Sequence, residues 1–517
     1  MELGAGEGIM GVSDELRLTY VAARWGGRDQ VDRYGSMDES RPVYPHPSGS
    51  PGVGRWAWPA LLALVGVGVS WALWAWYRFP AIGGADPGMW EAAAQTVARG
   101  EPSPVAPVFP VLVAAVVKVS GLGWDRAGMV IAVLCFAALG PATFLLARRL
   151  GAPVALSVLG GLVVSLEPWL ALGSLQCQPD TLSALVFVLA MLAGLAWLDA
   201  PRWPRLLLLL AIIGILPQVR EHAPPVAAGL MVLLVASPGR WSQRLGRLGL
   251  AVLAVLLVPM LLGEPPGLPW EQHWVQLRWG EVVRHFFETG SPSFLSGTPR
   301  GYREAFAQAY AEGSRLRIAW LHASLSFHSG WSPWLWLFPG LAGWLLLGRR
   351  RWLLLAGLLP LLAVPGGAQQ PRHVAVLVPL AVVCWVAALV RFGKPERWVL
   401  GGFTLALAML CCINLPRAAR DHQLRCELRG RIMEFSDELC LRTAPEAISA
   451  GGNQRPLVYC ERRQLGLAEA EQQPGPLFWV GALPEQRRED WPRLQASGWT
   501  PLQMKSELYP VFQRTGD

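Results

Sequence analysis

Residues 56–77 read WAWPALLALVGVGVSWALWAWY, an apolar run that ends at Arg78. About 20 apolar residues cross the hydrocarbon core of a bilayer, so this run predicts a membrane-spanning helix. Similar runs recur along the chain of 517 residues, of which 52% are hydrophobic and only 16% are charged. Soluble domains usually have about 25% charged residues. The sequence therefore predicts a multi-pass membrane protein.

Short arginine clusters separate the apolar runs and predict the topology. They fall at Arg148–Arg149, Arg202–Arg205, Arg240–Arg247, Arg349–Arg351 and Arg391–Arg397. Basic residues concentrate in cytoplasmic loops, so an even number of spans must separate successive clusters. This parity gives about eleven transmembrane helices. The loops 78–125 and 263–330 and the C-terminus are then extracytoplasmic. Residues 105–121 are left as a re-entrant or interface-lying helix.

The two ends of the chain differ from this central part. Residues 1–55 are polar and rich in Pro, Gly and Ser near their end, which predicts a disordered cytoplasmic tail. Residues 416–517 predict a small soluble α/β domain, with a polar helix near 417–442 and strands at 456–460 and 476–480. In an oxidising compartment its cysteines can pair. Cys426 and Cys440 are too far apart on one continuous helix, which leaves Cys440 with Cys460 as the more plausible pair.

The expected fold is therefore an all-α polytopic membrane protein, formed by residues 56–415, with juxtamembrane helices and a small C-terminal α/β domain. We expect it in the inner (plasma) membrane. The net charge of +8 does not indicate a nucleic-acid partner, because the basic residues are confined to the clusters between apolar runs.

Directly after the first span, residues 79–102 read FPAIGGADPGMWEAAAQTVARGEP. Asp86 and Pro87 suit the N-cap and first position of a helix, and Gly100 suits its end. An apolar stripe would let this helix lie on the membrane surface. The stripe consists of Trp90, Ala93, Ala94 and Val97. Asp86 is then either a helix cap or a functional acid.

The predicted topology collects charged residues on the extracytoplasmic face. They are Asp86, Glu167, Asp180, Arg220, Glu221, His222, Arg372 and His373. Charged groups at membrane depth cost several kcal/mol and usually face a cavity with a function. Their coincidence predicts one site.

The sequence from the first span onward resembles the GT-C glycosyltransferases. The span is followed by an acid, by an aromatic residue four positions after the acid, and then by A-R-G. This pattern is most similar to the dolichyl-phosphate-mannose–protein mannosyltransferases and the bacterial lipid A aminoarabinose transferases. The matching residues are Asp86, Trp90, Ala98-Arg99-Gly100, Pro107 and Pro110, then Leu166-Glu167-Pro168, Asp180-Thr181-Leu182 and Pro371-Arg372-His373. Pro87 stands where that family often has a second acid, and Trp90 where it usually has tyrosine.

The resemblance implies an inverting glycosyltransferase that moves a hexose or pentose from a polyprenyl phosphate to a hydroxyl of a glycan, lipid or protein acceptor. Asp86 would be the general base. One base suffices because phosphate leaves as a stable anion, whereas a glycosidase must also protonate its leaving group. Arg220, His222, Arg372 and His373 would bind the phosphate, with Trp90, Asp180 and Glu221 in support. No metal or other cofactor is implied.

Simpler interpretations remain for several of these residues. Arg220 and Glu221 can neutralise each other, and His222 can be a solvated loop residue. Asp180 either orients one of the cations or caps the helix that it begins. The aromatic stretch 269–287 either binds acceptor or forms an interfacial helix. For the whole chain, the alternatives are a lipid or saccharide transporter or flippase, and a scaffold subunit in which Asp86 is dispensable.

Overall fold

The structure is a computed structural model. It describes residues 56–78, 85–220, 223–237, 239–263, 300–314, 316–317, 320–321, 324, 331–347, 351–359, 371–413, 431, 434–443, 447–452, 472, 475–480, 491–496, 498–505 and 511–514. The predicted tail 1–55 and the aromatic stretch 269–287 lie outside these residues.

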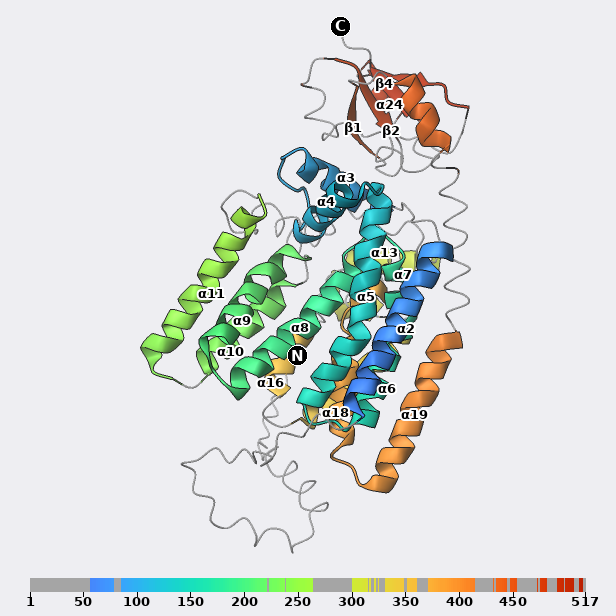
Figure 1. The fold of residues 1–517 in the computed structure, drawn as a ribbon. Coiled ribbons are helices and arrows are strands. Elements are labelled where there is room, and N and C mark those ends of the chain that lie inside the picture. Colours follow the sequence, from blue (N-terminus) through green and yellow to red (C-terminus); the bar gives the residue numbers. More distant parts are fainter. Residues whose placement is uncertain are drawn as a thin grey trace, which may run out of the picture. The chain divides into compact units, whose positions relative to one another are not determined.

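Within the described residues, a helix lies in each apolar run that the sequence assigns to the membrane (Figure 1). They are α2 (Ala57–Arg78), α5 (Trp124–Arg149), α6 (Val154–Ser165) with α7 (Pro168–Ser174), α8 (Asp180–Asp199), α9 (Trp203–Ile215) with η2 (Leu216–Gln218), α10 (Pro224–Ala236), α11 (Trp241–Leu261), α15 (Trp331–Leu345), α16 (Arg351–Leu358), α17 (Pro371–Ala375) with α18 (Val378–Leu389), and α19 (Lys394–Ile413). Among the described residues, 4 helices are long and apolar enough to cross a membrane, or 5 if α6 and α7, bent by 57°, form one span. The larger count of about eleven remains a prediction.

Exposed apolar side chains cover the outer helices. Trp58 on α2, Leu253 on α11 and Phe403 on α19 are all exposed. Apolar surface of this extent is unfavourable in water and matches the hydrocarbon of a bilayer. Helix α18 is different, because its residues from Val378 to Leu389 are buried with the exception of the half-buried Trp385. The protein is therefore a membrane protein whose helices surround α18.

Two glycines allow α15 to approach α18 closely. A Cβ atom at Gly340 would lie 2.6 Å from the Cβ of Ala381, and one at Gly343 would lie 2.7 Å from the carbonyl oxygen of Cys384. Small residues bring helices together in membranes, where dispersion and polar contacts replace the hydrophobic effect between helices. The close approach positions α17, which directly precedes α18.

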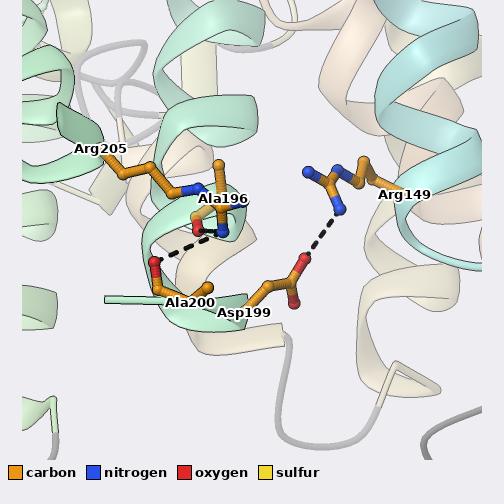
Figure 2. Close-up of polar contacts among 5 residues, drawn as sticks. All are labelled: Arg149, Ala196, Asp199, Ala200 and Arg205. Atoms are coloured by element: carbon orange, nitrogen blue, oxygen red, sulfur yellow. Dashed lines mark hydrogen bonds and ion pairs between the residues drawn. The ribbon is translucent and has the colours of Figure 1, made fainter. Parts of the chain in front are cut away.

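Three of the predicted arginine clusters meet at one end of α8. Figure 2 shows Arg149, at the end of α5, paired with Asp199, at the end of α8, with 3.1 Å between Nη1 and Oδ2. Figure 2 also shows Arg205 donating to the carbonyl oxygens of Ala196 and Ala200, 2.7 Å and 3.4 Å away.

The third cluster reaches the same end through Arg247, whose guanidinium lies 5.2 Å from the ring centroid of Trp197. Helices α5 and α8 therefore run in the same direction. Their arginine-rich ends lie together, as the parity of the clusters predicts.

Helix α3 (Ala85–Ala98) and helix α4 (Val108–Ser120) follow the first span. Helix α3 begins at Ala85, so Asp86 lies within its first turn rather than at the expected N-cap, a shift within the usual variation of helix ends. The helix ends as predicted, because Gly100 adopts a φ of 81°.

The expectation that the apolar stripe of α3 faces the membrane surface is wrong. Trp90, Ala93 and Ala94 are buried, and the Trp90 ring meets Phe109 of α4 edge-on at 6.0 Å. Protein packing therefore covers this stripe, because α4 and α5 lie against α3. At 13 residues, α4 is too short to span a bilayer alone.

The C-terminal residues form a four-stranded sheet in the order β1-β2-β4-β3. Its strands are β1 (Ile448–Gly452), β2 (Leu477–Val480), β3 (Thr500–Leu502) and β4 (Val511–Arg514), and α24 covers Trp491–Ala496. Strand β1 pairs parallel to β2, and the other pairs are antiparallel. Phe478 and Leu477, adjacent in β2, belong to different apolar clusters, as expected for a strand buried on both faces. Cys440 is disulfide-bonded, and both Cys426 and Cys460 lie outside the described residues.

Gly340→Ala tests the close contact of α15 and α18. We expect a loss of about 1–3 kcal/mol in the free energy of unfolding, because the new methyl group overlaps the backbone of Ala381. Gly402→Ala is the matched control, since its Cβ would meet nothing within 4 Å. Alanine also favours a helix over glycine by about 1 kcal/mol, so the control should be neutral or stabilising. Denaturation in detergent measures both, and equal stability of the two variants would contradict the packing.

Candidate active site

The site lies at the end of α8 opposite the arginine clusters. Helix α8 begins at Asp180 and has 20 residues, a length of about 30 Å. The hydroxyl of Thr181 donates to the carbonyl oxygen of Ala132 in α5 at 2.9 Å. Helices α5 and α8 run in the same direction, so their N-terminal ends lie together here.

An ion pair between Asp180 and Arg220 forms the centre of the site. The exposed fractions of their side chains are 3% and 4%. Arg220 follows η2, in the connection between α9 and α10. Because burying a lone guanidinium is costly, the carboxylate of Asp180 holds Arg220 in place.

Asp180 does not cap α8. The N-cap position is Pro179, and no side chain caps the helix there. Of the two roles left open by the sequence, the structure thus shows the orienting contact. The alternative pairing of Arg220 with Glu221 involves a residue outside the described part of the chain, as does the expected role of His222.

His373 on α17 makes the second contact of Arg220. Nη2 of Arg220 and Nε2 of His373 are 3.2 Å apart. All polar hydrogens of a guanidinium are donors, so Nε2 must be the acceptor. The contact therefore requires a neutral imidazole whose hydrogen is on Nδ1.

Arg372, the preceding residue on α17, reaches a different partner. Its Nη1 donates to Oε1 of Gln178 at 2.8 Å. Arg372 is partly exposed, whereas Arg220 is 3% exposed. We call Gln178, Asp180, Arg220, Arg372 and His373 the two-arginine site. Its members come from the start of α8, the connection after η2, and α17.

Helix α3 contributes one aromatic side chain, Trp90, to the surroundings of Arg220. Cζ of Arg220 lies 6.0 Å from the ring centroid of Trp90, at the outer limit of a cation–π contact. Asp86 lies four residues before Trp90 in α3, which is about one turn along the same face of the helix. The backbone of Asp86 is thereby close to the site, and its side chain lies outside the described part of the structure.

Glu167 lies beside the site rather than in it. One carboxylate oxygen accepts from the backbone N–H of Leu170 at 2.7 Å and caps α7. The other accepts from the hydroxyl of Ser332 in α15, also at 2.7 Å. Glu167 therefore ties the broken pair α6 and α7 to α15, and α17 packs against both α7 and α15.

Other buried acids lie around this end of the helices. Glu91 is 0% exposed and Asp125 is 7% exposed. Burial, and then the charges of Glu91 and Asp125, raise the pKa of the Cys177 thiol well above its usual value. The thiol is consequently unreactive. In the described ranges, no group of three His, Cys, Asp or Glu side chains is placed to hold a metal ion.

The sequence did not identify Gln178 and Ser332 as site residues. Both are buried or nearly so, and each binds a charged residue that the sequence did single out. The only sequence signal is that Gln178 lies two residues before Asp180, and nothing marks Ser332 within its apolar run.

The fold is that of a polytopic membrane protein and is similar to the fold of GT-C glycosyltransferases of known structure. The ArnT structure from Cupriavidus metallidurans bound to undecaprenyl phosphate matches with a TM-score of 0.50 at 12% identity, over 89% of this chain and 98% of that chain. The same protein in the apo state matches with a TM-score of 0.51 at 13% identity, over 88% and 98% of the two chains. No protein-family model and no curated protein matches the sequence. The chain thus has the GT-C fold of ArnT, a lipid A aminoarabinose transferase.

Asp180→Asn tests the buried ion pair. The variant leaves Arg220 buried without its counter-charge, and breaking such a pair costs about 3–5 kcal/mol. Asp199→Asn is the matched control, because it breaks an ion pair at the other end of the same helix whose side chains are 48% and 38% exposed. Exposed pairs contribute about 0–1 kcal/mol. Equal unfolding free energies for the two variants would contradict a stabilising role of the buried pair.

Proposed function

We propose that this protein is an integral-membrane inverting glycosyltransferase. Its donor is a sugar on a polyprenyl phosphate, and its acceptor is a hydroxyl group of a glycan, lipid or protein. The observation that carries the proposal is the two-arginine site, which places Arg220 beside Trp90 of α3 and Arg372 beside Gln178 in a GT-C fold. An ArnT with this fold has been seen with undecaprenyl phosphate, which supports a lipid-linked donor.

In the proposed reaction Asp86 accepts the proton of the acceptor hydroxyl. The hydroxyl oxygen bonds to the anomeric carbon as the bond from that carbon to the phosphate oxygen breaks, which inverts the configuration. The bonding electrons leave with the phosphate, so no acid is needed at the leaving group. The backbone of residue 86 lies one turn before Trp90, whose ring centroid lies 6.0 Å from Cζ of Arg220, so α3 brings the proposed base to the region of this cation.

The cations stabilise the phosphate that leaves. Arg372 suits direct contact because it is partly exposed and its planar fork donates two hydrogen bonds to a phosphate. Arg220 adds positive charge from a more buried position. Charge that is already oriented before the reaction lowers the barrier without a cost of reorganisation. His222 stays a candidate ligand of the phosphate, and no metal or other cofactor is needed for this step.

One observation supports an extracytoplasmic site, and another supports extracytoplasmic C-terminal residues. The site and the arginine clusters lie at opposite ends of α8, and arginines favour the cytoplasmic side. Cys440 is disulfide-bonded, and disulfides persist in oxidising compartments outside the cytoplasm. We place the protein in the plasma membrane with its C-terminal residues outside.

A transporter or flippase is the less favoured function. Such a protein needs polar groups along its path through the membrane. Here the buried hydroxyls of Thr143 and Ser183 bond to carbonyl oxygens of their own helix or its N-cap, Leu139 and Pro179. The buried charged side chains of the described residues instead gather at the end of α8 where Asp180 lies.

Asp86→Asn separates a general base from a residue that only stabilises the helix. Asparagine suits the start of a helix about as well as aspartate, but it cannot accept the proton. We expect folding to be unchanged and the transfer rate to fall by about 10²–10⁴-fold. The assay offers purified protein a panel of undecaprenyl-phosphate hexoses and pentoses with membrane-derived acceptors.

The matched control is Glu101→Gln, which neutralises an exposed acid just after the same helix. It should retain the wild-type rate. Normal turnover by a folded Asp86→Asn protein would remove Asp86 from the mechanism. No transfer by the wild-type protein from any donor of the panel would contradict the proposed function.

Labelling of single cysteines tests the side of the membrane. Ser120 lies exposed near the start of α5, and Pro201 lies exposed just after the end of α8. A membrane-impermeant thiol reagent added to intact cells should label Ser120→Cys and not Pro201→Cys, after subtraction of labelling of the native cysteines. The opposite pattern would invert the orientation, and the site would face the cytoplasm.

A further inference from the structure

We propose that His373 is a positioning residue rather than a ligand of the phosphate. It acts as a neutral hydrogen-bond acceptor that orients Arg220, so donor binding requires the unprotonated imidazole. This inference rests on the proposed function and specifies how the same site is regulated by pH. It reverses the role that the sequence suggests, in which His373 is one more cation for the phosphate.

The geometry at Arg220 carries the proposal. Its guanidinium meets the carboxylate of Asp180, lies 6.0 Å from the ring centroid of Trp90, and has Nη2 at 3.2 Å from Nε2 of His373. A protonated imidazole has no acceptor on either nitrogen. Protonation would therefore replace this hydrogen bond by two cations in contact, and like charges at such a distance repel each other in a partly buried site.

In the described part of the chain, three helices pack against α17, and two of them bring an acid towards His373. Helix α8 supplies Asp180 at its start, and α7 has Glu167 at its N-cap. Helix α15 carries no charged residue. On α17 itself, Arg372 is adjacent to His373. Arg220 and Arg372 disfavour an imidazolium, and Asp180 is already paired with Arg220. Histidine in this setting suits an acceptor that changes state near neutral pH.

The sign of the pH dependence separates the two roles. If His373 were a cation for the phosphate, donor binding would strengthen as the pH falls and the imidazole becomes charged. If His373 orients Arg220, binding weakens over the same range, because the acceptor is lost. The probe is undecaprenyl phosphate in detergent micelles, measured between about pH 5 and pH 8, the range in which histidine titrates.

The second ionisation of a phosphate monoester falls in the same range, near about pH 6. A variant with no titrating side chain at position 373 corrects for this effect. In His373→Gln, Oε1 lies about where Nε2 lies in histidine, so it provides an acceptor that never becomes charged. In His373→Asn the same amide is too short to reach Arg220. In His373→Leu no acceptor remains.

We expect His373→Gln to bind the lipid about as tightly as wild type near pH 8. Towards pH 5 the wild type should become roughly tenfold weaker than this variant, which corresponds to the loss of about one hydrogen bond to a charged group. His373→Asn and His373→Leu should bind roughly tenfold more weakly than wild type near pH 8. Wild type binding more tightly than His373→Gln at low pH, or the two having the same pH profile, would overturn the proposal.

The tautomer gives a second measurement that needs no lipid. Nitrogen-15 NMR of histidine-labelled protein, with the signal of His373 identified by its absence from His373→Gln, should show hydrogen on Nδ1 and none on Nε2 above neutral pH. Hydrogen on Nε2 would overturn the proposal. Because the protein is free of ligand here, this result stands even if the wild type transfers no sugar.

Discussion

The buried ion pair between Asp180 and Arg220 is the contact on which the arrangement of the site depends. A guanidinium cannot lose its charge, so once the fold buries Arg220 it must supply a counter-charge and acceptors. It does so from the first residue of α8 and from α17, with the ring of Trp90 alongside. One buried charge thereby fixes the relative positions of four segments that are far apart in the sequence.

The membrane explains why this cluster lies at the end of the helices. Within the hydrocarbon region every polar group needs a partner inside the protein, and hydroxyls such as Thr143 and Ser183 satisfy this by bonding to their own helix. Charged side chains cannot be satisfied in this local way. The buried charged side chains gather where α8 begins, and the arginine clusters gather where α8 ends. The two ends of α8 therefore have different surroundings: the candidate site lies at its start and the arginine clusters lie at its end.

The two arginines of the site have different surroundings, and this suggests a division of roles. Arg220 is buried and matched by a carboxylate, so its orientation is fixed before any ligand binds. Arg372 is partly exposed and contacts the neutral amide of Gln178. A buried, fixed charge and a more accessible one suit an anion that arrives from the membrane and leaves with additional charge. Arg372 and His373, which contacts Arg220, are adjacent in α17, so a small movement of α17 would act on both arginines.

The sequence by itself determined the membrane class, the position of the helices, the end of α3 at Gly100 and the shared location of three arginine clusters, because these follow from local hydropathy, local backbone preference and charge. It also selected Asp180, Arg220, Arg372 and His373 as site candidates. The tertiary structure alone decided their partners. The contacts join residues that are 153 and 194 positions apart, and no local pattern encodes such pairings. The tertiary structure likewise decided that the apolar stripe of α3 faces protein. The sequence could not decide this, because lipid and a protein core are equally apolar surroundings for the same side chains.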